Sequence, residues 1–174
     1  MTVDLPISRS FDDAHQAGID EVNRWRGRCI QCFAYIELAA ATALAGMAAR
    51  DPASSKKVSP LFGSRIQALR DAFREGEPFH TRGKKAAKAL DELQPCLEFR
   101  NILVHSVGHV YVAPAGHWIW SYRVNADGKA DQSGTICSDQ AKRLERELAA
   151  GSRKLSDLLR NLISHSPPAE AVTE

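Results

Sequence analysis

Polar side chains able to do chemistry interrupt an apolar stretch at residues 98–106, which read Glu-Phe-Arg-Asn-Ile-Leu-Val-His-Ser. His105 has an unperturbed pKa of about 6.5, so its imidazole can accept or donate a proton near neutral pH. Arg100 offers forked N–H donors that fit the nonbridging oxygens of a phosphate as charge builds on them. Asn101 can orient either the imidazole or the phosphate. These residue types indicate proton transfer at a phosphate.

A helix is expected to carry these residues. Apolar side chains at helical spacing predict one face in a core: Leu93, Leu97, Val104 and Val107. Gly108 follows as the expected C-cap. Asn101 and His105 are four residues apart and share one face, whereas Arg100 points elsewhere. Arg100 either swings its long side chain back toward the imidazole or serves a site completed by a second copy of the chain.

The same pattern of residues also has a structural interpretation. Arg100 can be an ordinary helix arginine paired with a carboxylate, and His105 a histidine at the negative end of the helix dipole. A second copy of Arg-Asn-x-x-x-His occupies residues 160–165, and Arg74–His80 is a looser match that contains a glycine and a proline. We favour the first copy because it lies inside the chain, whereas the second runs into Ser-Pro-Pro and a tail.

The motif at residues 100–105, set on a helix of a small helical protein, resembles that of the HEPN superfamily. Arg100 and His105 match its two fixed positions, and Asn101 matches the polar residue that often follows the arginine. The resemblance implies a compact helical bundle that forms a homodimer through the motif helix, with a composite cleft at the twofold axis. It also implies a metal-independent endoribonuclease that needs no cofactor and leaves a 2′,3′-cyclic phosphate by attack of the RNA 2′-hydroxyl.

The resemblance leaves several roles open. A toxin with a neutralising antitoxin, a phage-defence component and an RNA-processing factor all fit it. Val107 stands where some HEPN toxins carry a tyrosine that a partner enzyme modifies, so regulation by that route is not expected. The main alternative is a HEPN-like module that binds a nucleotide, RNA or protein without chemistry, since fold does not settle function. A metal pair of His105 and His109 is a further alternative, although no third ligand is evident.

Charged residues outside the motif suggest supporting roles. Glu37 lies among apolar neighbours, so it is expected either to reach the surface or to pair with a cation, for which Arg100 is the candidate. Two basic clusters can contact the RNA backbone or can be ordinary solvated helix faces: Arg24, Arg26 and Arg28, and Arg82, Lys84, Lys85 and Lys88. The formal net charge of +2 is too small to indicate a nucleic-acid partner by itself.

Composition predicts one soluble domain over residues 1–174, with 44% hydrophobic and 25% charged residues. Cys29 and Cys32 have no second cysteine or histidine pair at zinc-finger spacing, so we expect buried reduced thiols in a cytoplasmic protein. Residues 1–13 lack the apolar region of a secretory signal. The apolar run 29–49 contains polar residues and much alanine, which favours a buried bundle helix over a membrane segment.

The predicted fold is mainly α, a four- or five-helix bundle with a small antiparallel hairpin or three-stranded meander within residues 109–137. An N-terminal extension over 1–13 precedes it and a flexible tail over 166–174 follows it. The aromatic stripe of the meander can stack bases, but such a stripe is more often the packed side of a small sheet. The helices are expected over 14–50, 61–76, from Lys84 to Pro95, along the motif after Pro95, and from the N-cap Ser138 onward.

Overall fold

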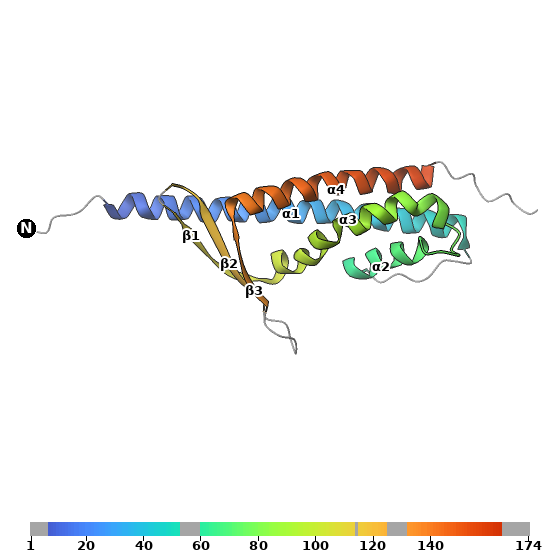
Figure 1. Cartoon of the computed structure of the whole chain (residues 1–174), viewed down its shortest axis with the longest axis horizontal. Coiled ribbons are helices and arrows are strands. Elements are labelled where there is room, and N and C mark those ends of the chain that lie inside the picture. The colour runs from blue at the N-terminus through green and yellow to red at the C-terminus, as the bar shows by residue number, and fades with distance from the viewer. Residues whose placement is uncertain (1–6, 53–59, 114, 125–131, 165–174) are drawn as a thin grey trace, which may run out of the picture. The chain divides into compact units, whose positions relative to one another are not determined.

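The structure, a computed structural model, describes residues 7–52, 60–113, 115–124 and 132–164. The described part of the chain is mainly helical, with four helices and one three-stranded antiparallel sheet (Figure 1). In chain order the elements are α1 (Ile7–Arg50), α2 (Phe62–Ala72), α3 (His80–His105), β1 (Val107–Val112), β2 (Trp118–Val124), β3 (Gln132–Cys137) and α4 (Ser138–Ser164). The prediction of a helical protein with a small meander before the last helix is confirmed. The predicted tail at 166–174 lies outside the described residues.

The first helix, α1, is longer than the sequence suggested. It begins at Ile7 rather than near Ala14, so part of the predicted N-terminal extension is helical. Its buried side chains recur every three or four residues: Val22, Trp25, Cys29, Phe33, Ile36, Ala40, Ala43 and Met47.

By length and composition, one helix among the described residues, Asp12–Arg50 within α1, could cross a membrane. The core helix of a soluble protein passes the same test, and a stripe of buried apolar residues on one face is typical of such a helix.

The chain divides into two compact units. Unit 1 comprises residues 1–31 and 96–148, and unit 2 comprises residues 32–95 and 149–174. Because α1, α3 and α4 each contribute residues to both units, the single domain expected from the chain length stays a prediction.

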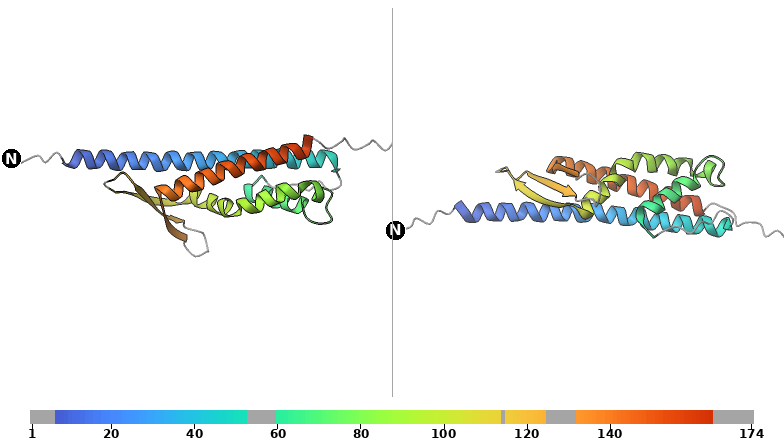
Figure 2. Two further views of the ribbon diagram at one scale, coloured as in Figure 1. Left: turned by 45° about the horizontal axis from the view of Figure 1, so that its top comes forward. Right: turned by 90° about the horizontal axis from the view of Figure 1, so that it is seen from below.

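Unit 1 is built around a tryptophan cluster. The sheet has the strand order β1-β2-β3, with Tyr111 opposite Ile119 and Trp120 opposite Ile136. Trp25 of α1 packs against Trp118 and Trp120, with ring centroids 5.7 and 5.8 Å away. The aromatic stripe is therefore the packed side of the sheet, the interpretation that the sequence favoured. The sheet and the start of α4 lie along the N-terminal half of α1 (Figure 2).

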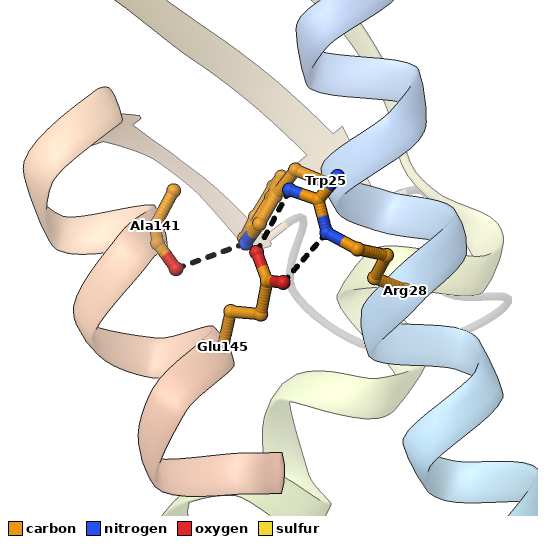
Figure 3. Close-up of polar contacts among 4 residues, drawn as sticks. All are labelled: Trp25, Arg28, Ala141 and Glu145. Carbon is orange, nitrogen blue, oxygen red and sulfur yellow. Dashed lines mark hydrogen bonds and ion pairs between the residues drawn. The ribbon is translucent and has the colours of Figure 1, made fainter.

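Polar contacts fix α1 to α4 within unit 1 (Figure 3). The indole Nε1 of Trp25 donates to the carbonyl oxygen of Ala141 at 3.0 Å. Arg28 donates from Nε and Nη2 to the two carboxylate oxygens of Glu145 at 2.6 and 2.9 Å. This forked geometry raises the pKa of the Arg28 guanidinium, mainly through its hydrogen bond to Glu145. The predicted RNA-binding role of Arg28 thus competes with a structural ion pair.

The prediction for the end of the motif helix was wrong. The helix α3 ends at His105, and Val107 and Gly108 belong to β1, opposite Arg123 and Tyr122. A side chain at position 108 would overlap the Trp120 indole, so glycine is present for close strand packing and not as a helix cap. The β region therefore starts at 107 rather than 109 and ends at Cys137, as predicted.

Unit 2 is a helical bundle of four segments, drawn from α1, α2, α3 and α4. Small residues let its helices approach closely. A Cβ at Gly83 would lie within 2.7 Å of Phe73 ring atoms, and one at Gly151 would lie 2.9 Å from Leu93 Cγ. The helix was expected to begin at Lys84, but α3 begins at His80, and Gly83 lies against the Phe73 ring. The helix then continues through Pro95.

The start of α4 differs in detail from the prediction. Ser138 is its first residue rather than its N-cap. Its hydroxyl lies 3.4 Å from Nδ1 of His117. The side chain of Gln140 accepts from the backbone N–H of Cys137 at 2.9 Å, which is half of a capping box with Cys137 as the cap.

Candidate functional site

The predicted motif lies on the last turns of α3, within unit 1. Ile102 and Leu103 are buried and hold the helix to the core, whereas Asn101 and His105 are exposed and Arg100 is half-buried. At about 100° per residue, Asn101 and His105 are about 40° apart around the helix axis, and Arg100 is about 140° from His105. The structure thus presents Asn101 and His105 together to solvent and directs Arg100 to a different side.

Arg26 of α1 holds the end of this helix, a role that the sequence did not predict. Because α3 ends at His105, the carbonyl of Leu103 lacks the N–H donor that a continuing helix would supply. Arg26 supplies donors instead, from Nη2 at 2.7 Å and Nε at 3.3 Å. Its guanidinium also lies 4.8 Å from the ring centroid of Trp120.

Arg26 is therefore a positioning residue for the motif. Burial lowers the pKa of its guanidinium from the ordinary value, but arginine stays charged at every physiological pH. In the sequence, Arg26 was visible only as one member of a basic cluster with Arg24 and Arg28. The signal for its inward role is its spacing, since Val22, Trp25 and Cys29 place the buried face of α1 beside it.

An aromatic contact holds the helix one turn before Leu103. Phe99 meets Tyr122 of β2 edge to face, with ring centroids 5.9 Å apart. Tyr122 in turn packs against Trp120 at 5.1 Å. The turn that carries Arg100 and Asn101 is therefore held at both ends on one side of the helix, by Phe99 before it and by the Arg26 contact with Leu103 after it.

Exposed apolar side chains occur next to His105 in the chain and on the sheet that follows it. Val104 and Val107, on either side of His105 in the chain, have 40% and 75% of their surface exposed. Tyr111 and Ile119, which are paired across β1 and β2, are exposed to 60% and 45%. Exposed apolar side chains of this kind can contribute to a surface that packs against another molecule.

The other predicted site residues lie in unit 2. Glu37 accepts a hydrogen bond from Arg65 Nη1 at 2.9 Å, so a neighbouring arginine satisfies its half-buried carboxylate. The predicted pairing of Glu37 with Arg100 stays a prediction. The basic residues proposed to contact the RNA backbone are all exposed on the first turns of α3: Arg82, Lys84, Lys85 and Lys88.

The second copy of the motif, at residues 160–165, is only partly described by the structure. Arg160 is exposed on α4 and pairs with Asp157 at 3.2 Å. The matching histidine at position 165 lies outside the described residues. Within the part of the chain that the structure describes, no group of three or more His, Cys, Asp or Glu side chains could hold a metal ion.

Arg26, which holds the end of the motif turn, also lines a pocket that the sequence did not predict. The pocket has a volume of about 620 Å³, lies between α1 and β1 in unit 1, and includes Arg26 in its wall. Its other polar lining residues are His15, Asn23, His109 and Tyr111. The polar lining residues from α1 are His15, Asn23 and Arg26. They fall at spacings of eight and three residues, which places them on one helix face.

No protein-family model, curated protein or solved structure matches the chain. Its function is therefore inferred from its own residues.

Proposed function

We propose that the chain is a metal-independent endoribonuclease with a HEPN-like helical bundle, and that Arg100, Asn101 and His105 form its catalytic site. The supporting observation is that Asn101 and His105 stand exposed together on a helix end held by buried neighbours and by Arg26. A solvent-facing histidine on a rigid turn is well placed for proton transfer to a substrate as large as RNA.

In the proposed reaction, the RNA supplies its own nucleophile. His105 takes the proton from a 2′-hydroxyl, whose oxygen forms a bond to the adjacent phosphorus while the bond from phosphorus to the 5′-oxygen breaks. A protonated imidazole then gives a proton to the departing 5′-oxygen, and the product carries a 2′,3′-cyclic phosphate. Arg100 donates hydrogen bonds to the nonbridging oxygens, where negative charge builds in the transition state. Asn101, one turn from His105, orients the imidazole or the phosphate.

A homodimer through the motif helix completes the proposed site. Since Arg100 is about 140° from His105 around α3, a second chain can bring its Arg100 to the first chain's His105. The exposed Val104 and Val107 provide apolar area beside the histidine for such a contact. Two His105 side chains near a twofold axis then act as acid and base.

The basic start of α3 is proposed to contact the RNA backbone through Arg82, Lys84, Lys85 and Lys88. Each phosphate contact of this kind makes binding weaker as salt rises. The biological role that follows is an RNA-cleaving toxin or defence component acting in the cytoplasm, with an antitoxin or another regulatory protein as a partner.

The test is cleavage of a mixed RNA by purified protein in excess EDTA, with mapping of the product ends. The wild type is expected to leave cyclic phosphates, and His105→Ala is expected to lose cleavage by about 10²–10⁴-fold because no group remains to move the proton. Arg100→Ala is expected to be similarly impaired. Arg160→Ala, which changes the matching arginine of the second motif copy, is the control and should cleave normally. Circular dichroism must first show that each variant is folded.

The alternative is a HEPN-like module that binds RNA, a nucleotide or protein without chemistry. The exposed pair of Tyr111 and Ile119 on the outer face of the sheet favours it, because a contact surface needs no catalytic histidine. If wild type and His105→Ala bind RNA equally and neither cleaves it, this alternative replaces the enzyme.

A further inference from the structure

The strand β1 forms one edge of the sheet and, among the strands that the structure describes, pairs with β2 alone. Ala113, the residue after it, donates its N–H to the carbonyl oxygen of His117 at 2.8 Å. Hydrogen-bonded and non-hydrogen-bonded pairs alternate along an antiparallel ladder, so the odd-numbered residues of β1 also direct their backbone groups toward β2. The backbone N–H and C=O groups of its even-numbered residues therefore point to the outer edge of the sheet: Gly108, Val110 and Val112.

The pocket of about 620 Å³ runs along this outer edge. Its wall on the sheet side comprises the consecutive residues 108–112, whose side chains alternate between the two faces of the sheet. A pocket that contacts every one of them meets the strand along its backbone and not on one face. The opposite wall is a face of α1 between His15 and Arg26. The pocket is therefore a groove between a helix and a strand edge, and a strand edge of this kind can accept an extended peptide as an added strand.

The sequence of β1 lacks the features with which proteins block an edge strand. It reads Val-Gly-His-Val-Tyr-Val and contains no proline, lysine or acidic residue. Its register with β2 runs from Val107 to Val112 without a bulge. An edge without charges, prolines or bulges is a template for pairing with another extended chain.

The end of the groove at Gly108 is cationic. A side chain at position 108 would overlap the Trp120 indole, and the Arg26 guanidinium lies 4.8 Å from the Trp120 ring centroid. A guanidinium has five N–H groups, so the bonds of Arg26 to the carbonyl of Leu103 use only part of its donor capacity. No aspartate or glutamate lines the groove within the described part of the chain. This end therefore favours an acidic side chain.

The other end of the groove is apolar. A Cβ at Gly18 would overlap the Val112 side chain, so this end of β1 lies against α1 one to two turns before Ile19 and Val22 give way to Arg26. From position 18 to position 26 the helix rises about 12 Å. The strand rises about 13 Å from position 108 to position 112. The two walls therefore run alongside each other for the length of a peptide of five residues.

We infer that this groove binds an extended acidic peptide segment of a partner protein, which pairs with β1 as a further antiparallel strand. Peptide residues opposite Gly108, Val110 and Val112 form hydrogen bonds with them and point their side chains toward α1. Because the peptide runs opposite to β1, its sequence from the N-terminus is apolar, any residue, apolar, any residue, acidic. The acidic side chain then meets Arg26. The inference concerns a partner surface and does not rest on the proposed ribonuclease function.

The first experiment is an NMR titration of the full chain with the blocked peptide Ac-Val-Thr-Val-Thr-Glu-NH₂ as the probe. Valine and threonine favour extended structure. Saturable one-to-one binding is expected, and the amides of Gly108, Val110 and Val112 should become protected from hydrogen exchange. Amides of β3, at the other edge of the sheet, should not change. No saturable binding, or binding without protection of these three amides, would overturn the inference.

N-methylated probes test whether the peptide backbone makes the contact. Methylation of the central valine amide removes an N–H that faces β1, so binding should fall about tenfold or more. Methylation of the second threonine amide is the matched control, because that N–H points away from β1 and the peptide should bind like the unmethylated probe. Equal effects of the two methyl groups would show that no strand is added.

The acidic position is tested by charge reversal. Replacing the glutamate of the probe by lysine should weaken binding about tenfold, because a charge-assisted hydrogen bond to Arg26 is lost. In Arg26→Gln, shown to be folded by its thermal transition, the two peptides should bind equally. A preference for glutamate that persists in this variant would contradict the assigned direction of the peptide. The N-methylated probes on the wild type test strand addition even if the variant does not fold.

A second copy of the chain is the competing occupant of the groove. Protection of the same three amides without peptide, rising with protein concentration, would show that β1 pairs with another chain and would overturn the peptide inference. The outcome for the enzyme is separate. RNA cleavage without peptide binding leaves the ribonuclease standing and removes the peptide groove, whereas peptide binding without cleavage does the reverse.

Discussion

The helices α1 and α4 meet through large side chains in unit 1 and through small ones in unit 2. In unit 1, the indole of Trp25 fills the space next to α4 and donates to the carbonyl of Ala141. In unit 2, Gly46 packs directly under Ile163, and the hydroxyl of Ser152 donates to the carbonyl of Cys32 at 3.3 Å. The same pair of helices therefore uses two packing solutions along its length.

This difference bears on where chemistry can occur. Small residues bring helix backbones together and leave little space for polar side chains. The tryptophan cluster in unit 1 instead lies beside an opening between α1 and β1, whose wall includes Arg26, His15 and His109. Unit 2 also has a hollow, of about 490 Å³, but no histidine is among its described lining residues. The proposed catalytic residues and the pocket beside Arg26 both lie in unit 1.

The largest expected effect comes from Trp25→Ala, which empties the centre of unit 1. Trp25 is 1% exposed and contacts two other tryptophans, so truncation should cost about 3–5 kcal/mol of unfolding free energy. Chemical denaturation measures the loss, and hydrogen exchange locates it. Amides of β2 and β3 should lose protection before those of α2. Uniform loss across both units would show that the two regions are not separately stabilised.

A smaller effect of about 1–3 kcal/mol is expected from Gly83→Ala in unit 2. The added methyl group would press on the Phe73 ring, which is buried and has little space to move. Gly63→Ala is the matched control because nothing lies within 4 Å of its Cβ position. That change should leave the stability unchanged or raise it slightly, because alanine loses less backbone entropy on folding than glycine does. Stabilisation by both substitutions would contradict the close packing described for unit 2.

The smallest effects concern ion pairs on the surface. Replacing Arg28 by alanine breaks a forked pair with Glu145 and should cost about 0.2–1 kcal/mol at low salt, and less as salt rises. In unit 2, Lys154 makes a single contact with Glu92 at 2.6 Å, and its replacement should cost less. Denaturation midpoints at low and high salt compare the two pairs. A larger loss from Lys154→Ala would reverse the expected order.

The Lys154 pair also has a pH signature. The hydrogen bond from Lys154, and secondarily the charges of Lys154 and Lys88, lower the pKa of Glu92 below its ordinary value. A carboxylate with a lowered pKa adds stability above its unfolded pKa of about 4.3, and this stability is lost as pH falls through the folded value. Carboxyl NMR titration should show the Glu92 pKa rising toward its ordinary value in Lys154→Met. An unchanged pKa would exclude Lys154 as the cause.

Periodic patterns in the sequence predicted most of the fold. The stripe on α1, the alternation of Trp118, Trp120 and Tyr122, and the leucines of α4 were each long enough to specify their element. The boundaries were predicted less well. Val107 continued the helical spacing of Val104, yet strand pairing with Arg123 places it in β1. Contacts with distant residues decide such cases, and local spacing does not contain them.

The candidate site was predictable only in its local part. Asn101 and His105 share a face because of helix geometry alone, so the sequence was sufficient for them. The contact of Arg26 with Leu103 joins residues 77 positions apart, and the pocket joins α1 to β1 across a similar separation. No short motif encodes either one. The mixture of polar and apolar residues on one face of α1 was the available clue.

Only Ser106 separates the helix that carries His105 from the strand that lines the pocket. The pairing of β1 with β2 begins at Val107, so the register of the sheet also fixes where the last turn of α3 must stop. A one-residue slip of that register would turn the side chains of β1 to the other face and would shift the turn that carries His105 with them.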